Sequence, residues 1–458
     1  MIFPYPPSLR ILLLRFFAFF VFLLHCRGEP RSRGYLKLPL VHRDPLLSPR
    51  KIIHWDFQRL SALRAPVVSG ASTGSGQYLV DLRLGTPPQR LQLVADTGSD
   101  LVWVRCSACR DCSRRPPGTA FRARHSRTFA PFHCYSPECG LAPAPNPPAP
   151  CNRTVLHTPC RYHYAYADAS FTSGFFSRDA VTLNASSGGE VEVRRLDFGC
   201  GFGVAGPSLS GARGVLGLGR GPISFASQVG KPIGNKFSYC LMDYTLSPPP
   251  TSYLLIGNGD AHRSSQRRLR FTPLLTNPLS PTFYYIGIEA ASVDGVRLRI
   301  DPAVWALDGA GNGGTVVDSG TTLTFLPEAA YRRILSAFRR RVRLPRVAPP
   351  DPNLEFCVNV SSSSSSPAAT AEGREGREGR MGLPRLSFRL MGGAAFSPPP
   401  RNYFVDAAEG VQCLALLPVS SDSGFSVIGN LMQQGFLFEF DREESKVGFS
   451  RTGCVFSS

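Results

Sequence analysis

The sequence contains little that could span a membrane or build a helical protein. Its one long apolar run, ILLLRFFAFFVFLLH at residues 11–25, carries Arg15 and has about 15 residues, whereas a spanning helix needs about 20. No second apolar block follows, and the C-terminal RTGCVFSS has no hydrophobic tail, so no GPI anchor is expected. Long helical patterns are few, and 44 glycines and 41 prolines are typical of a turn-rich β protein.

The N-terminal residues have the pattern of a targeting segment followed by a pro-segment. Arg10 precedes the apolar block, which predicts a secretory signal peptide over residues 1–28 with cleavage near Gly28; a retained signal anchor is the alternative. Residues 29–72 lack cysteine and precede the first turn-rich strands, so they are interpreted as a pro-segment. From Gly76 onward the sequence changes to short strand patterns such as QYLVDLRLG and LQLVADTGS.

Cysteine is frequent in the remainder of the chain. Of 13 cysteines, Cys26 lies in or beside the signal peptide, which leaves an even number; in a secreted chain this indicates six disulfides, whose pairing the spacing leaves open. The run Cys106-x-x-Cys109-x-x-Cys112 also fits metal ligands, but no histidine pair completes a zinc site, so no metal is expected. Three sequons fit passage through the secretory pathway: Asn152, Asn184 and Asn359.

The formal net charge is +18. Such a surplus of positive charge attracts nucleic acid, membranes or acidic cell walls when it is concentrated on one face. The arginines are scattered, however, apart from the run 339–341 and the pair Arg267 and Arg268. A solvated basic surface is therefore the favoured interpretation.

Two aspartates occur in matching turns, one in each half of the chain. Asp96 lies in VADTGSDLVWV, residues 94–104, and Asp318 lies in VVDSGTTLTFL, residues 316–326. After each of them comes an apolar pair and a glycine, around Gly217 and around Gly429, and a strand that ends in glycine lets another backbone approach closely. Four elements in matching order predict two similar lobes that present their aspartates to a shared cleft.

The expected domain organisation follows from this repeat, because 458 residues are too many for one core. The lobes are expected over residues 73–243 and 244–458. The first carries a Cys- and Pro-rich insert at 106–160. The second carries one helix, expected at roughly 327–341, and a low-complexity segment at 361–380 that is interpreted as a disordered surface loop.

The chemistry that two facing carboxylates support is general acid–base hydrolysis. Two carboxylates about 3 Å apart share one proton over a wide pH range, since both cannot ionise cheaply. The charged member takes a proton from water, the neutral member donates to the substrate carbonyl, and the water attacks without a covalent intermediate. Asp96 and Asp318 are the predicted catalytic pair. Their turn neighbours are the predicted supporting residues: Thr97, Gly98, Ser99, Ser319, Gly320 and Thr321.

From about Gln77 to Cys454 the sequence resembles the pepsin-type aspartic endopeptidases, through the paired DTGS and DSGTT turns and their apolar-apolar-Gly partners. Within that family it is similar to the plant nepenthesin-like group, through the Cys-rich insert after DTGSDLVWV, FGCG at 198–201, GLGRGPISFASQ at 217–228 and VHRD in the pro-segment. The resemblance implies an all-β, bilobal fold with the active-site cleft between two similar lobes, and no cofactor.

The resemblance also implies a β-hairpin flap with a tyrosine over the cleft. YAYADASFTSG, residues 164–174, occupies that place, so Tyr166 is the expected flap residue and Trp103 its hydrogen-bond partner. The family often has glycine where Ala167 and Ala169 stand, which bears on flap mobility.

The disulfide pattern of the group carries over residue by residue. It implies the following pairs: Cys106–Cys109, Cys112–Cys200, Cys134–Cys160, Cys139–Cys151, Cys240–Cys454 and Cys357–Cys413.

The function implied is a secreted zymogen that cleaves polypeptides at acidic pH, between bulky apolar residues, and is blocked by pepstatin-type inhibitors. We expect a monomer without a stable membrane span after signal removal, in the apoplast or vacuole rather than the chloroplast. One alternative is a catalytically silent binding or inhibitor protein on the same fold, although both aspartate turns are intact. The other is a basic protease that also binds DNA; no strip of aromatic and arginine residues is visible, so no nucleic acid is expected.

Overall fold

The computed structural model describes residues 36–42, 76–107, 111–112, 120–243, 252–257, 269–361, 382–419 and 424–454, with gaps of one to three residues inside these ranges. The predicted signal peptide, the predicted pro-segment apart from 36–42, and the low-complexity segment beyond Ser361 lie outside the described residues. Within the described part, no helix is long and apolar enough to cross a membrane.

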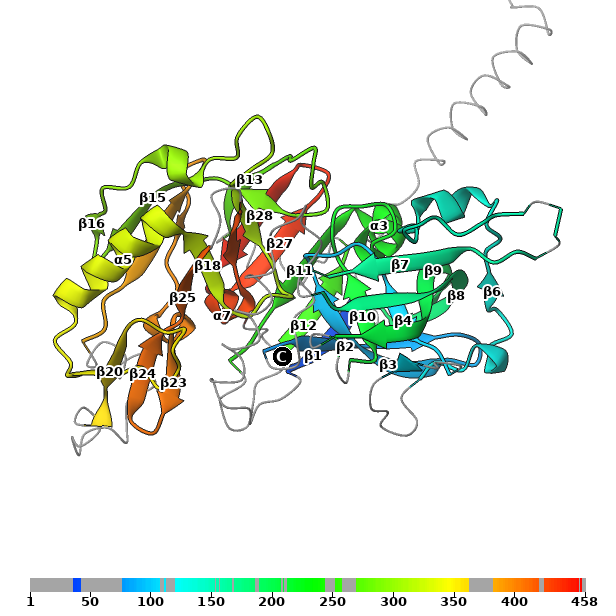
Figure 1. Cartoon of the computed structure of the whole chain (residues 1–458), viewed down its shortest axis with the longest axis horizontal. Coiled ribbons are helices and arrows are strands. Elements are labelled where there is room, and N and C mark those ends of the chain that lie inside the picture. Colours follow the sequence, from blue (N-terminus) through cyan, green and yellow to red (C-terminus); the bar gives the residue numbers. More distant parts are fainter. Residues whose placement is uncertain are drawn as a thin grey trace, which may run out of the picture.

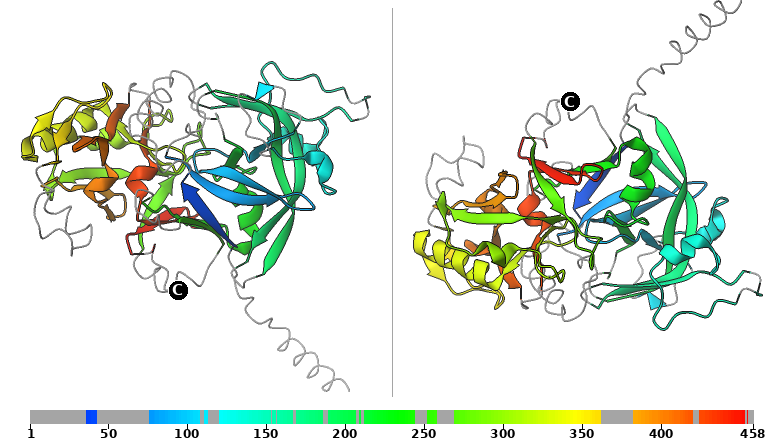
Figure 2. Two further views of the ribbon diagram at one scale, coloured as in Figure 1. Left: turned by 90° about the horizontal axis from the view of Figure 1, so that it is seen from below. Right: turned by 90° about the horizontal axis from the view of Figure 1, so that it is seen from above.

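The described chain forms two lobes that are built mainly from β-strands. Figure 1 shows the N-terminal lobe in cyan and green beside the C-terminal lobe in yellow and orange, and Figure 2 shows the same division from below and from above. The expected all-β, bilobal fold is confirmed. The largest sheet runs through both lobes, and two four-stranded sheets complete the C-terminal lobe.

A layer of antiparallel strands joins the lobes. In order of pairing, its strands are β1 (Leu36–His42), β12 (Ser252–Ile256), β11 (Lys236–Cys240), β27 (Leu437–Asp441), β28 (Lys446–Ser450) and β13 (Arg270–Leu275). Strand β1 belongs to the predicted pro-segment and also pairs with β2 (Tyr78–Leu84), where Leu40 lies opposite Val80. Its alternate residues Leu36, Leu38 and Leu40 are buried, as in a strand with one face on a core. This part of the predicted pro-segment is therefore packed into the sheet.

The N-terminal lobe consists of antiparallel hairpins and the parallel pairs that hold the first aspartate turn. Besides β2, its strands are β3 (Gln89–Asp96), β4 (Trp103–Arg105), β5 (Asp111–Cys112), β6 (Ala130–Pro131), β7 (Arg161–Ala165), β8 (Phe171–Asn184), β9 (Glu190–Ala205) and β10 (Gly214–Gly217). Strand β2 alternates buried and partly buried residues because one of its faces lies on the core. Short helical turns complete the lobe: η1 (Ala123–His125), η2 (Pro137–Leu141), α3 (Phe225–Gly230) and η4 (Lys231–Ile233).

The C-terminal lobe repeats this arrangement around the second aspartate turn. Its part of the large sheet contains β14 (Tyr285–Ile286), β17 (Thr315–Val317), β18 (Thr324–Pro327), β25 (Leu416–Val419) and β26 (Ser426–Ile428). One smaller sheet is β16 (Val296–Arg297), β15 (Ile288–Val293), β21 (Leu386–Leu390) and β22 (Ala395–Phe396). The other is β19 (Arg346–Val347), β20 (Cys357–Asn359), β24 (Val411–Leu414) and β23 (Phe404–Ala408). The remaining short elements are η6 (Pro302–Trp305), η9 (Pro400–Asn402) and α7 (Asn430–Gln433).

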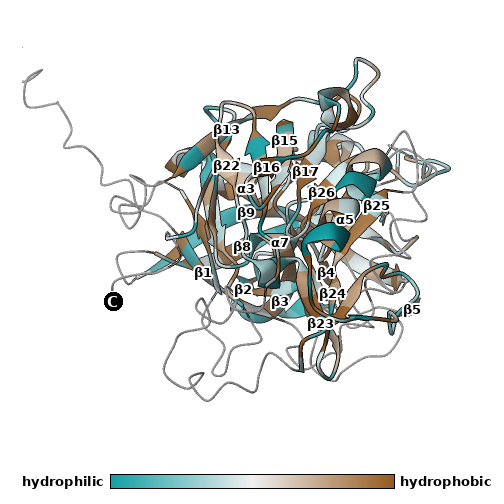
Figure 3. Ribbon diagram, turned by 90° about the vertical axis from the view of Figure 1, so that its left-hand side faces the viewer, coloured by the Kyte–Doolittle hydropathy of each residue, from teal (hydrophilic) through white to brown (hydrophobic). Residues whose placement is uncertain are grey.

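Helix α5 (Glu328–Arg341) forms where the sequence predicted a helix. It follows Pro327, and its buried residues Tyr331, Ile334, Leu335 and Phe338 recur at helical spacing. Figure 3 shows hydrophilic colour on α5 and hydrophobic colour in strands such as β25. Three arginines in its last turn lie at the negative end of the helix dipole, where positive charge is favourable.

Two of the expected disulfides agree with the structure and the other four do not. The structure pairs Cys240 with Cys454 and Cys357 with Cys413, as expected. Cys106 pairs with Cys200, so the expected pairs Cys106–Cys109 and Cys112–Cys200 are wrong. The reason is the parallel pairing of β4 with β9: Val104 lies opposite Cys200, so Cys106, which directly follows β4, lies close enough to Cys200 to pair with it. Cys109 lies outside the described residues.

The pairing inside the Cys-rich insert is also exchanged relative to the expectation. Cys134 pairs with Cys151 and Cys139 pairs with Cys160, so the expected pairs Cys134–Cys160 and Cys139–Cys151 are wrong. The side chain of Cys160 is buried in the hydrophobic cluster around Phe132, and Cys139 packs against that same cluster. Packing against this cluster therefore brings Cys139 to Cys160, and Cys134 pairs with the exposed Cys151.

Candidate active site

Asp96 is the last residue of β3, and its position is set by a parallel strand pair. Strand β10 runs alongside β3 so that Gly217 lies opposite Asp96, and the amide of Leu218 donates to the Asp96 carbonyl at 2.8 Å. A Cβ atom on Gly217 would lie 2.5 Å from the backbone carbon of Asp100. Only glycine permits this approach, which is the role that the sequence pattern predicted for it.

Asp318 is placed in the same way in the other lobe. It follows β17, which runs parallel to β26 with Val317 opposite Ile428, and its amide donates to the Ile428 carbonyl at 3.2 Å. A Cβ atom on Gly429 would lie 2.1 Å from the Leu323 carbonyl oxygen. The repeat in the sequence is therefore a repeat in the structure.

The two turns are hydrogen-bonded to each other through Thr97 and Ser319. The Thr97 amide donates to the Ser319 hydroxyl at 3.1 Å, and the Ser319 amide donates to the Thr97 hydroxyl at 2.9 Å. In turn, the Thr97 hydroxyl donates to the Val317 carbonyl at 3.3 Å and the Ser319 hydroxyl to the Ala95 carbonyl at 2.9 Å. These residues reach across to the opposite strand rather than to their own aspartate, so they fix the distance between the turns.

The carboxylates themselves are held by their own turns. Asp96 accepts from the Gly98 amide at 3.0 Å and from the Ser99 hydroxyl at 2.5 Å. Asp318 accepts from the Gly320 amide at 2.8 Å and from the Thr321 hydroxyl. These four neighbours, predicted as supporting residues, are thus the groups that donate hydrogen bonds to the two carboxylates.

The turns also bring the two carboxylates together in the interior. Asp96 is 0% and Asp318 3% exposed. A Cβ atom on Gly98 would lie 3.0 Å from both carboxylate oxygens of Asp318, so a larger residue would crowd the second carboxylate. Burial of a carboxylate is unfavourable unless it is hydrogen-bonded, and here each carboxylate accepts two hydrogen bonds from its own turn.

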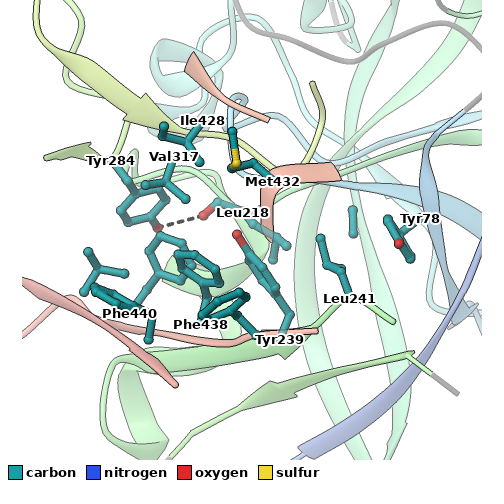
Figure 4. Close-up of a cluster of buried hydrophobic side chains, with 14 of the residues drawn as sticks. Tyr78, Leu218, Tyr239, Leu241, Tyr284, Val317, Ile428, Met432, Phe438 and Phe440 are labelled. Carbon is teal, nitrogen blue, oxygen red and sulfur yellow. Dashed lines mark hydrogen bonds between the residues drawn. The ribbon is translucent and has the colours of Figure 1, made fainter. Parts of the chain in front are cut away.

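A polar layer behind Asp318 was missed by the sequence analysis. The Gln433 side-chain amide donates to the carbonyls of Asp318 at 3.1 Å and Ile428 at 2.8 Å, and the Tyr239 hydroxyl donates to the Gln433 side-chain oxygen. Burial, with the nearby charge of Asp318, raises the pKa of Tyr239 well above its ordinary value. Figure 4 shows Tyr239 among Leu218, Met432 and Phe438 in this core. The glutamine pair after SVIGNLM was the only signal in the sequence.

Asn430 extends this layer to the start of the first lobe. Its side-chain amide donates to the Gly76 carbonyl at 2.7 Å and to the Ser319 carbonyl at 3.0 Å. The Tyr78 hydroxyl donates to the Met242 carbonyl at 2.8 Å and accepts from the side-chain amide of Gln434 at 2.9 Å. The chain entering β2 is thereby anchored beside the second aspartate turn.

Tyr166 lies where the hairpin of β7 and β8 begins its turn. The indole nitrogen of Trp103 donates to the Tyr166 hydroxyl at 2.6 Å, and both side chains are buried. Burial, the neighbouring Tyr164 and the charge of Asp96 raise the pKa of Tyr166 well above its ordinary value. The structure thus brings together the two residues that the family resemblance singled out, close enough to Asp96 for its charge to act.

Ala169 gives the hairpin turn an uncommon backbone. Its φ is 62°, a left-handed conformation that glycine adopts at less cost, and its amide donates to the Tyr166 carbonyl at 3.1 Å. Ala167, the other alanine noted in the sequence, lies outside the described residues. The turn is therefore left-handed at an alanine, although glycine would adopt this conformation at less cost.

The structure describes the asparagines of all three sequons. Asn152 and Asn184 are exposed, and Asn359 is partly exposed in β20. Among the residues that the structure describes, no group of three or more His, Cys, Asp or Glu side chains is placed to hold a metal ion.

Comparison with known proteins places this geometry in a family. The family models described as "Xylanase inhibitor N-terminal" and "Xylanase inhibitor C-terminal" match residues 78–258 and 283–451. Aspartyl protease family protein 2 of Arabidopsis thaliana is 37% identical over 400 residues, covering 87% of this chain and 75% of that protein. The chain belongs to the plant pepsin-like aspartic protease family. Another relative is aspartic proteinase nepenthesin-2 of Nepenthes gracilis, which is 33% identical over 425 residues; the match covers 92% of this chain and 88% of that protein.

Solved structures show the same fold at lower identity. The structure titled "Crystal structure of edgp" has a TM-score of 0.65 and 23% identity, and covers 92% of this chain and 96% of that chain. The structure of basic 7S globulin from soybean has a TM-score of 0.64 and 18% identity, and the match covers 93% of this chain and 99% of that chain. At this identity the likeness of this protease-family chain to them concerns the fold alone.

Proposed function

We propose that this protein is an aspartic endopeptidase that hydrolyses polypeptides at acidic pH, with Asp96 and Asp318 as its catalytic pair. The observation that carries the proposal is the meeting of two intact aspartate turns, cross-linked by Thr97 and Ser319, at buried positions. One carboxylate takes a proton from water while the other donates a proton to the peptide carbonyl. Acidic pH supplies the singly protonated pair that this mechanism requires.

The hairpin that carries Tyr166 is proposed to act as the flap over an extended substrate. Its hydrogen bond to Trp103 fixes the tyrosine near Asp96, and the hairpin presents strand backbone for contacts with the substrate main chain. Bulky apolar residues on both sides of the scissile bond, inhibition by pepstatin-type compounds and a monomeric state are parts of the same proposal.

Synthesis as a secreted zymogen is proposed from the N-terminal segments. The signal pattern, the sequons at Asn152, Asn184 and Asn359, and five described disulfides are consistent with an oxidising compartment. Because β1 is packed between β12 and β2, removal of the pro-segment would require this pairing to be broken. The apoplast or the vacuole is the proposed destination.

A second candidate function is a catalytically silent inhibitor on the same fold. It is favoured by one specific observation, since both matching family models are described as halves of a xylanase inhibitor. The intact aspartate turns, and the names of relatives such as nepenthesin-2, favour the protease.

The deciding experiment is cleavage of a denatured protein from pH 2 to 8, with and without pepstatin. The wild type is compared with Asp96→Asn, Asp318→Asn and the control Asp294→Asn, which changes an exposed aspartate in the β15–β16 hairpin. We expect pepstatin-sensitive cleavage at acidic pH, reduced by about 10³-fold or more in both site variants, since general acid–base catalysis alone contributes roughly 10²–10⁴-fold. Correctly folded, pro-segment-free wild type that cleaves nothing would establish the inhibitor function instead.

A further inference from the structure

The carboxylate of Asp100 bridges the two lobes behind the catalytic pair. Its Oδ1 accepts from the Gly221 amide at 2.7 Å, and its Oδ2 accepts from the Thr282 hydroxyl at 2.7 Å. Thr282 belongs to the C-terminal lobe, between β13 and β14, whereas Asp100 follows the first aspartate turn directly. One side chain therefore joins the N-terminal turn to the opposite lobe.

From Thr282 the connection continues to the second aspartate. Two residues later, the Tyr284 carbonyl accepts from the Val317 amide at 3.1 Å, and Tyr285 lies opposite Val316 in the pairing of β14 with β17. Val317 immediately precedes Asp318. A shift of Thr282 would thus be transmitted through two strands to the second carboxylate.

On the other side the connection returns to the first aspartate through the loop that follows β10. The Leu218 amide donates to the Asp96 carbonyl at 2.8 Å and the Arg220 amide to the Thr282 carbonyl at 3.0 Å. The Tyr284 hydroxyl donates to the Leu218 carbonyl at 2.7 Å, the bond drawn in Figure 4. The same loop is therefore bonded to Asp96 and to the segment that Asp100 holds.

The loop is shaped around the Asp100 carboxylate. A Cβ atom on Gly219 would lie 2.4 Å, and one on Gly221 2.2 Å, from its oxygens, so these last two of the three glycines in GLGRG leave room for the acid. The corresponding position in the other turn, counted from Asp318, is the uncharged Thr322, against which Gly76 packs. The charged bridge thus exists on one side of the pseudo-symmetric site only.

The bridge is also compatible with acidic conditions. Burial raises the pKa of Asp100, while the hydrogen bonds from Thr282 and Gly221 and the charge of Arg442 lower it. A neutral carboxyl can donate to the Thr282 hydroxyl instead of accepting from it. The contact between the lobes therefore persists in either protonation state.

We infer that Asp100 is a positioning residue: by holding Thr282 it sets the position of Asp318 relative to Asp96. The inference rests on the proposed function, because it assigns the bridge to the same hydrolysis. A positioning role and a purely structural role differ in their effect on the kinetics. The geometry between the two carboxylates affects the transition state more than it affects substrate binding, so a positioning residue changes kcat more than KM.

The test uses protein that is made as the full-length precursor and then activated, and it compares Thr282→Val with Thr282→Ser, and Asp100→Ala with Glu443→Ala. Serine keeps the hydroxyl and valine removes it at nearly constant volume, while Glu443 is an exposed acidic residue on the turn between β27 and β28. The readouts are kcat and KM for a peptide at acidic pH, the pepstatin inhibition constant and the unfolding temperature. If Asp100→Ala fails to fold, the valine and serine pair answers the question alone.

We expect Thr282→Val and Asp100→Ala to lower kcat by about tenfold to a hundredfold with KM changed by less than about twofold. Pepstatin should bind less tightly by a similar factor, and Thr282→Ser and Glu443→Ala should match the wild type. An active wild type with unchanged kcat in folded Thr282→Val overturns the inference and leaves the proposed function intact. An inactive wild type overturns the proposed function, and the inference with it.

Discussion

Thr97 and Ser319, 222 residues apart in the sequence, each donate a backbone amide to the hydroxyl of the other, at 3.1 and 2.9 Å. The reciprocal pair is buried, and it joins two turns that come from different lobes. Because the two hydroxyls also bond to strand carbonyls of the opposite lobe, the lobes cannot separate here without leaving several polar groups unpaired.

Loss of one hydroxyl from this pair should weaken both folding and catalysis. Thr97→Val removes the acceptor of the Ser319 amide and the donor to the Val317 carbonyl. We expect the free energy of unfolding to fall by about 1–3 kcal/mol and kcat to fall at least about tenfold. Urea unfolding and peptide cleavage measure the two effects. Thr97→Ser, which keeps the hydroxyl, should behave like the wild type, and equal activity of the serine and valine variants would contradict the assigned role.

The hydrogen bond between Trp103 and Tyr166 should matter more for cleavage than for folding. Tyr166→Phe leaves the buried indole N–H without its 2.6 Å partner, and we expect kcat/KM to fall by about tenfold as the hairpin loses its anchor. Tyr162→Phe is the control, since Tyr162 is a buried tyrosine of β7, the strand that leads to Tyr166, and bonds to Thr172 instead. If both variants lose the same activity, the effect comes from the strand and not from the flap contact.

The disulfide pairing can be read directly by mass spectrometry. Proteolysis without reduction should release one peptide pair that joins Cys106 to Cys200 and another that joins Cys139 to Cys160. Because the first link closes a long loop between β4 and β9, Cys106→Ser with Cys200→Ser should lower the free energy of unfolding by about 2–5 kcal/mol. A peptide that joins Cys134 to Cys160 would show that the pairing implied by the family was right after all.

The pH dependence of stability should contain a contribution from Glu439. Burial in β27 raises the pKa of Glu439 above its ordinary value of 4.5; Lys236 and Lys446 act against this and Asp441 adds to it. At pH values between the pKa of Glu439 in the unfolded chain and its raised pKa in the folded protein, the native state binds more protons than the unfolded state. The contribution of Glu439 to stability is therefore present at low pH and is lost as the pH rises through the raised pKa.

Glutamine does not titrate, so the Glu439→Gln variant does not lose stability in this way. Its free energy of unfolding, relative to that of the wild type, should therefore increase as the pH rises from about 4 to 7. Unfolding temperatures of the two proteins at several pH values measure the difference. The variant Glu443→Gln, on the turn between β27 and β28, is an exposed control and should show no trend. A constant difference between Glu439→Gln and the wild type would show that Glu439 does not titrate in this range.

The sequence alone determined the existence of two lobes and the identity of the aspartate pair. Both were visible because they depend on local patterns: a strand that leads into an Asp-Thr-Gly or Asp-Ser-Gly turn, and an apolar pair that ends in glycine. The glycines of these patterns are required by backbone approaches that no other residue permits, as Gly217 and Gly429 show. Helix α5 was equally visible, because its buried residues recur with the helical period.

Only the tertiary structure decided which distant groups meet. Cysteine spacing carries no information on pairing. The parallel register of β4 and β9, and the packing of Cys139 against the cluster that contains Cys160, gave partners that the family resemblance did not imply. Asp100 and Thr282 are unremarkable in the sequence, and Gln433 follows a motif without being part of it. The bond from Thr282 to Asp100 and the bond from Tyr239 to Gln433 arise because two lobes, each folded from its own pattern, pack against each other. Hydrogen bonds between the lobes depend on positions in space that local sequence does not encode.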